Sequence, residues 1–174
     1  MLDVMPECYV DTNLIEYLLG VGVNHQHSCS KVVGQLKNTF ADRFAVGIID
    51  KDKVELGYIR ECAVIAQSHH LTLLKHTVNP QFLITVAPAI DRFVLDCAHD
   101  SGVAPEDYGI PSELKEFTEI SKSVTSNTDQ RFKALFAALK DNQEVKLLRT
   151  VLKYLIENKY NADLEALKQL FPSS

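Results

Sequence analysis

The 174-residue sequence lacks the patterns that mark several common classes of protein. It has no apolar run of about 18 residues or more, which excludes a membrane-spanning helix. Its first residues carry acidic side chains and no basic stretch ahead of an apolar one, so they do not form a secretory signal peptide. We therefore expect a cytoplasmic protein that has no membrane partner.

Cysteine is scarce and irregularly spaced. The four cysteines, Cys8, Cys29, Cys62 and Cys97, are separated by 21, 33 and 35 residues, so no CxxC-type zinc pattern exists. In a reducing compartment we expect them to be free thiols that pack as small hydrophobic side chains. The sequence also has neither a P-loop of the ATP-binding kind nor the G-x-S-x-G turn of serine hydrolases.

A basic excess is missing as well. The chain has 18 Lys and Arg against 23 Asp and Glu, a net charge of −5, which excludes a basic protein that simply coats nucleic acid. The acidic excess lies in residues 1–110, with 8 basic and 14 acidic side chains, whereas residues 111–174 hold 10 and 9. This charge distribution is compatible with an enzyme that contacts phosphate groups through bound metal ions.

Strand-like and helix-like segments alternate in residues 1–110, and the pattern changes near residue 110. Short apolar runs bounded by polar residues predict strands at 8–10, 44–49, 71–74 and 82–86. Helical patterns lie between them, including one over residues 54–66. We therefore predict an α/β domain over residues 1–110, with a mostly parallel central sheet of about four strands flanked by helices.

Residues 111–174 predict a C-terminal all-helical extension. Apolar residues recur at helical spacing in three stretches, of which Phe132, Leu135, Phe136 and Leu139 form the first. Such stripes indicate packing, either against the α/β domain or against a partner. A protein partner or a homo-oligomer through these helices is therefore left open.

Acidic residues that directly follow predicted strands are the candidates for chemistry. Asp11 follows the first strand, and Asp50 and Asp52 follow the second. Asp91 lies in the first turn of the helix after residues 82–86, and Glu16 lies five residues beyond Asp11. If the strands are parallel neighbours, these carboxylates meet at one edge of the sheet, where oxygen ligands favour Mg²⁺ or Mn²⁺. The alternative is that they form polar turns and stabilise helix N-termini.

The same segments resemble the Toprim fold, the family of topoisomerase and primase catalytic domains that includes small nucleases related to the OLD family. The resemblance rests on an acid after the first strand with Glu16 five residues on, on the Asp-x-Asp of residues 50–52, and on the proline-then-acid helix start in residues 86–94. These motifs span roughly residues 8–98. The glutamate and glycine that the family has after its first strand are replaced here by Asp11 and Thr12.

The resemblance implies an α/β domain that binds one or two Mg²⁺ ions and acts on the phosphodiester bonds of nucleic acid, DNA or RNA. By position, Asp50, Asp52 and Asp91 would be metal ligands, and Asp11 would serve as acid or base with support from Glu16. A catalytically inactive α/β interaction module, with the helical extension docking a partner, is an alternative of a different class.

A second resemblance rests on residues 10–15. Asp11-Thr12-Asn13 after an apolar segment is similar to the start of PIN-domain ribonucleases, which also gather acids around Mg²⁺. Asp91 and Glu55 would then be further acids. This reading leaves the strand at 44–49 and its two aspartates unexplained, so we rank it second.

Histidines and one lysine near the first helix are candidates for binding phosphate. His25 and His27 lie in a predicted loop, and Lys31 lies at the start of the next helix, where backbone N–H groups also face an anion. The two histidines could also bind a metal or move a proton, but no second Cys/His pair completes a finger-type site. Solvated loop residues are the simpler interpretation.

Overall fold

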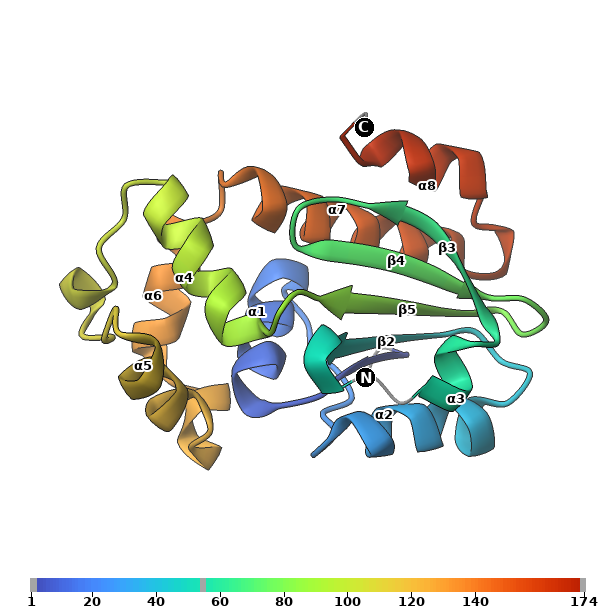
Figure 1. The fold of residues 1–174 in the computed structure, drawn as a ribbon, viewed down its shortest axis with the longest axis horizontal. Coiled ribbons are helices and arrows are strands. Elements are labelled where there is room, and N and C mark those ends of the chain that lie inside the picture. Colours follow the sequence, from blue (N-terminus) through green and yellow to red (C-terminus); the bar gives the residue numbers. More distant parts are fainter. Residues whose placement is uncertain (1–2, 54–55, 173–174) are drawn as a thin grey trace.

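A computed structural model describes residues 3–53 and 56–172, and it shows a five-stranded mixed sheet with helices on both faces (Figure 1). The strand order is β1-β2-β5-β4-β3, in which β1, β2 and β5 are parallel and β4 and β3 are antiparallel to their neighbours. The predicted α/β class is confirmed, and the sheet has five strands where about four were predicted and combines two parallel with two antiparallel strand pairs. The strands are β1 Val4–Pro6, β2 Ala45–Asp50, β3 Cys62–Gln67, β4 Leu71–His76 and β5 Gln81–Val86.

The first strand lies earlier in the chain than predicted. Residues 8–10 are not a strand, because Cys8 is the extended residue before helix α1, Tyr9–Leu19. Val10, Leu14 and Leu18 recur every four residues and are all buried, which is the pattern of a helix packed on the sheet. The strand is instead β1, whose three residues are fully enclosed in the protein.

The edge strand β3 replaces the C-terminal half of a predicted helix. The structure has a 3₁₀ turn at Lys51–Lys53 and a short helix α3, Leu56–Ile59, before β3, while residues 54–55 lie outside the described residues. The uncharged segment Cys62–Gln67 pairs antiparallel with β4, with an irregularity between Val64 and Ala66. Backbone pairing with a neighbouring strand outweighs its weak helical pattern, since strand formation depends on context.

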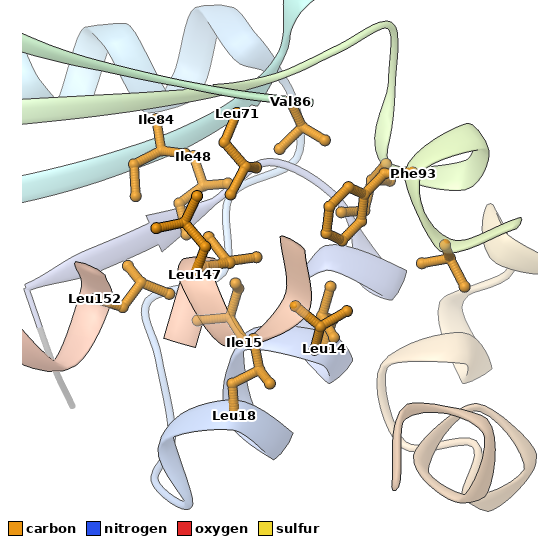
Figure 2. Close-up of a cluster of buried hydrophobic side chains, with 14 of the residues drawn as sticks. Leu14, Ile15, Leu18, Ile48, Leu71, Ile84, Val86, Phe93, Leu147 and Leu152 are labelled. Carbon is orange, nitrogen blue, oxygen red and sulfur yellow. The ribbon is translucent and has the colours of Figure 1, made fainter. Parts of the chain in front are cut away.

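Successive residues of β2 face two separate cores, as the alternation of a strand requires. Val46 and Ile48 point to the larger core and Ala45 and Ile49 to the smaller one. Figure 2 shows α1 and α7 side chains packed against the sheet in the larger core. The remaining helices are α2 Cys29–Gly34 with a π-helical continuation Gln35–Phe40, α4 Ile90–Asp100, α5 Leu114–Ser121, α6 Gln130–Ala138, α7 Gln143–Asn158 and α8 Leu164–Leu170.

The apolar stripes of the C-terminal helices belong to this larger core. Phe132 and Phe136 of α6 and Leu148, Leu152 and Leu155 of α7 are buried together with α1 and the sheet. The described C-terminal helices therefore pack on the α/β part of the same chain. The domain boundary at residue 110 stays a prediction.

Gly47 allows α2 and its continuation to approach the middle of β2. A Cβ atom at this position would lie 2.8 Å from Val32 Cγ1 and 2.9 Å from Leu83 Cδ1. Only a residue without a side chain fits between the strand and these neighbours.

In residues 3–53 and 56–172 we find no helix with the length and apolar character needed to cross a bilayer.

Candidate functional site

Two buried carboxylates meet at the carboxyl ends of neighbouring parallel strands. Glu7 directly follows β1, and Asp50 is the last residue of β2. Their exposed fractions are 4% and 5%. Because β1, β2 and β5 run in the same direction, their carboxyl ends share one edge, which is where open α/β sheets bind ligands.

Hydrogen bonds fix these two side chains to the main chain. The Asp50 N–H donates to Glu7 Oε2 at 3.2 Å, which ties the carboxylate after β1 to the end of β2. The Ile90 N–H, in the first turn of α4, donates to Asp50 Oδ1 at 2.9 Å. The site is therefore built from two strands and the start of one helix, and its carboxylates are oriented without any ligand.

Asp11 is the third carboxyl of this region. It lies in the first turn of α1 and is buried, and it accepts hydrogen bonds from the Cys8 N–H at 3.1 Å and from the Cys8 thiol at 2.8 Å. Burial first, and then the negative charges of Asp50 and Glu7, raise the pKa of Asp11 to about 7, although the Cys8 hydrogen bonds act in the opposite direction. The three carboxyls thus share one region of strongly negative potential.

The Cys8 thiol completes the first turn of α1. Burial, followed by the charge of Asp11, raises the pKa of the Cys8 thiol well above its usual range. The thiol therefore stays protonated at neutral pH and continues to donate to Asp11. Such a partly buried, protonated cysteine has a structural role and not a nucleophilic one.

Asp52 lies beside this cluster but faces solvent. It belongs to the exposed 3₁₀ turn after β2, and its N–H donates to the Pro88 carbonyl at 3.3 Å. It lines two adjoining pockets, one of about 550 Å³ with Val64 and Thr72, the other of about 510 Å³ with His70 and Pro88. Among the predicted metal ligands, Asp52 is the one that a ligand in these pockets could touch directly.

Asp91 and Glu16 are placed differently from each other. Asp91 is half-buried in the first turn of α4, next to the residue whose N–H bonds Asp50. Glu16 lies about 7.5 Å further along α1 than Asp11, from the helical rise per residue, and its Oε1 accepts the Val23 N–H at 3.1 Å. Glu16 therefore orders the loop after α1 and is not brought to the carboxylate cluster.

His25 and His27 flank the first turn of α1. The His25 ring stacks on Tyr9 with centroids 4.7 Å apart, and the His27 ring lies 4.7 Å from it edge-on. The Thr12 hydroxyl donates to the Cys8 carbonyl, so its oxygen accepts from His25 Nδ1 at 2.6 Å. Burial and the neighbouring His27 lower the pKa of His25, which favours the neutral ring. This pair lies near the cluster, but its known contacts are structural.

The loop that carries these histidines also covers the edge of β1. The Asn24 N–H donates to the Val4 carbonyl and the Gln26 N–H donates to the Pro6 carbonyl, at 2.9 and 3.0 Å. Lys31 lies beyond this loop in α2, where its side chain is exposed and its N–H donates to Ser28. We find no contact that brings Lys31 to the carboxylates within the described ranges.

Glu7 is the site residue that the sequence patterns did not predict. It was missed because residues 8–10 were interpreted as the first strand, which assigned the acid after that strand to Asp11. Two signals point to Glu7 instead. Pro6 lacks an N–H and is suited to the end of an edge strand, and the helical spacing of apolar residues already begins at Val10.

No three His, Cys, Asp or Glu side chains in the described part of the chain are arranged so that they could hold a metal ion together. A cation at this edge would therefore be held by at most two of these side chains, together with water and a substrate. Mg²⁺ is commonly bound in this way, because it retains several waters and uses one or two carboxylates.

Comparisons of this chain with protein family models, with curated proteins and with solved structures found no match. The resemblances to the Toprim and PIN families accordingly stay hypotheses that rest on the motifs and on the geometry above.

Proposed function

We propose that this protein is a phosphodiesterase that cleaves nucleic acid with Mg²⁺ or Mn²⁺ as cofactor. The observation that carries the proposal is the position of Glu7 and Asp50, which are buried at the ends of two parallel strands and joined by the hydrogen bond from the Asp50 N–H to the Glu7 carboxylate. This is the ligand-binding edge of an α/β sheet, and it is occupied by carboxylates.

Electrostatics support a cation at this edge. Burying several carboxylates together costs free energy unless protons or cations offset their charge, and the raised pKa of Asp11 reports that cost. The donor atoms of Glu7 and Asp50 are oxygens only, which fits Mg²⁺ or Mn²⁺ better than softer metals.

The side chains have distinct roles in this proposal. Glu7 and Asp50 would hold the ion, and Asp52 lines the two pockets through which a substrate would approach it. The Ile90 N–H holds Asp50 in place, and Asp11 holds a proton beside the two ligands near neutral pH. The bound ion would polarise the phosphate and make a coordinated water a stronger nucleophile.

The alternative of an inactive interaction module receives no support from the C-terminal helices. An exposed apolar stripe on residues 145–156 would have favoured that alternative. Val145, Leu148, Val151, Leu152 and Leu155 are all buried, so this stripe is used inside the chain.

The direct test is cleavage of plasmid DNA and of single-stranded RNA in the presence of Mg²⁺ or Mn²⁺. We expect Glu7→Gln and Asp50→Asn each to lower kcat/KM by about 100-fold or more, since a lost metal ligand removes most of the charge stabilisation. Glu119→Gln, the same acid-to-amide change on the exposed face of α5, should leave the rate within about twofold. Cleavage that survives in both site variants would contradict the assignment.

A second measurement reports the ion without activity. Binding of Mn²⁺ to the folded state should raise the midpoint of thermal unfolding of the wild-type protein, and this rise should disappear in Glu7→Gln. The same scan shows that each variant folds. A wild-type protein that neither cleaves nor is stabilised by Mn²⁺ would refute the proposal.

A further inference from the structure

A second site lies at the other end of α1, in a pocket of about 320 Å³ between α1, α7 and the turn that precedes α7. Among the described residues that line it, all the charged ones are basic. The lining residues are Tyr17, Leu18, Leu19, Gly20, Lys140, Arg149 and Lys153.

The three cations of this pocket are exposed and unengaged. In the described part of the chain, no ion pair or side-chain hydrogen bond involves Lys140, Arg149 or Lys153. By contrast, Lys146 on the same helix pairs with Asp141 at 3.6 Å. Three unpaired cations around one pocket are notable in a chain whose net charge is −5, because acidic side chains that could attract them outnumber the basic ones.

Tertiary packing gathers these cations. Arg149 and Lys153 are one helical turn apart on the outer face of α7, whose opposite face is buried against α1 and the sheet. Lys140 comes from the turn between α6 and α7. The C-terminus of α1 carries a dipole charge of about −0.5, so three positive charges exceed what that helix end requires.

Tyr17 adds an aromatic surface to the pocket. It is half-buried, with its ring tilted against Phe136 at a centroid distance of 6.3 Å. Within residues 3–53 and 56–172 its hydroxyl makes no hydrogen bond. Cations beside a partly exposed aromatic ring are the combination that binds the phosphates and bases of single strands.

We propose that this pocket binds the backbone of single-stranded nucleic acid, with phosphates at Lys140, Arg149 and Lys153 and a base against Tyr17. The proposal rests on the proposed function for its choice of nucleic acid over an acidic peptide. From Asp11 to Gly20 the helical rise gives about 14 Å, so a strand of a few nucleotides held in this pocket would be long enough to reach the carboxylate cluster. The helical extension would thus supply the phosphate contacts that the acidic part of the chain lacks.

The test measures binding of short fluorescein-labelled oligothymidylate and oligouridylate by fluorescence anisotropy, in EDTA so that no cleavage occurs. The double variant Arg149→Glu/Lys153→Glu should bind about tenfold or more weakly than the wild type, and its dependence of log K on log salt should fall from a slope of about −2 to below about −1 in magnitude. Lys115→Glu/Lys122→Glu, in α5 and directly after it, makes the same change in net charge away from the pocket and should alter affinity less than about twofold. Tyr17→Leu should weaken binding about fivefold or more while thermal unfolding shows a folded protein.

Each other outcome overturns the proposal. Equal losses of affinity in the pocket and control variants would show that binding depends on net charge alone. A polyglutamate peptide that competes as well as the unlabelled oligonucleotide would show that the partner is an acidic protein. Cleavage of the same oligonucleotides with Mn²⁺ separates the two proposals. If the Arg149→Glu/Lys153→Glu variant cleaves as fast as the wild type, only the proposed binding pocket is contradicted. If binding depends on the pocket but no cleavage occurs, only the proposed phosphodiesterase activity is contradicted.

Discussion

The main-chain N–H of Asp50 donates to the carboxylate of Glu7 at 3.2 Å, and this bond continues the pairing of two strands beyond their last backbone partners. The register of β1 and β2 ends at Pro6 opposite Ile48. Glu7 therefore takes the place of a strand carbonyl for a donor two residues further along β2. A candidate metal ligand is also part of the framework of the sheet.

Replacing Glu7 should separate these two roles. Glu7→Ala removes an acceptor from a buried N–H and should lower the free energy of unfolding by about 1–3 kcal/mol, whereas Glu7→Gln keeps an oxygen for that N–H and should lower it less. Urea denaturation of both variants measures the difference. If Glu7→Gln is as destabilising as Glu7→Ala, the hydrogen bond is not what Glu7 contributes to stability.

The raised pKa of Asp11 should make stability fall as pH rises. The unfolded carboxyl ionises near its ordinary pKa of 3.8, but the folded one keeps its proton until about pH 7. Between these values the unfolded state releases a proton that the folded state retains, so the free energy of unfolding decreases with pH and then levels off above about 7. A difference of one pH unit between the folded and unfolded pKa values corresponds to about 1.4 kcal/mol, so the expected decrease is on the order of a few kcal/mol.

Asp11→Asn removes this titration and is its control. The variant should show a flatter dependence of unfolding free energy on pH between about 4 and 7 than the wild type, measured by denaturation at a series of pH values. A wild-type profile that rises with pH over this range, or an unchanged profile in the variant, would contradict the electrostatic account of the cluster.

Gly47→Ala should loosen the packing of α2 on β2. The new methyl group would lie closer than 3.0 Å to side-chain atoms of Val32 and Leu83, and the β-branched valine cannot rotate away freely. We expect a loss of about 1–3 kcal/mol in unfolding free energy. Gly34→Ala, where the added Cβ meets nothing within 4 Å, is the matched control and should be neutral or stabilising.

Leu148→Ala tests whether the helical extension shares the core of the α/β part. Leu148 is fully buried in the cluster that contains α1 and the sheet, so the substitution should cost about 2–5 kcal/mol. The exposed neighbour Thr150→Ala should change stability by less than about 0.5 kcal/mol. A loss confined to a separate, early unfolding transition would show that the two parts fold independently.

Three strands could be predicted from the sequence because their signals are local. The segments that became β2, β4 and β5 are short apolar runs bounded by polar residues, and they were found within one or two residues of their ends. The first strand and β3 could not be found in this way. A three-residue strand has too few positions for a period, and Cys62–Gln67 becomes a strand because β4 is available to pair with it.

The residues of the candidate site could likewise be predicted only where the strand that carries them has a strong local signal. Asp50 and Asp52 were expected after a strand because the strand signal of β2 is strong, and the structure puts Asp50 at the last position of β2 and Asp52 in the turn that follows. Glu7 was missed because the strand before it carries almost no local signal. Glu16 was expected in the cluster from its spacing to Asp11, but spacing along a helix does not show which neighbour a long side chain will contact.

The sequence by itself determined the α/β class, the acidic balance of residues 1–110, the absence of a long apolar run and the aspartates after β2, because these depend on composition and on short-range periodicity. Only the tertiary structure decided that Glu7 meets Asp50, that Asp11 is enclosed with them, and that Lys140, Arg149 and Lys153 surround the end of α1. Those relationships join residues far apart in the chain, and they exist only once strand pairing and helix packing have brought the segments together.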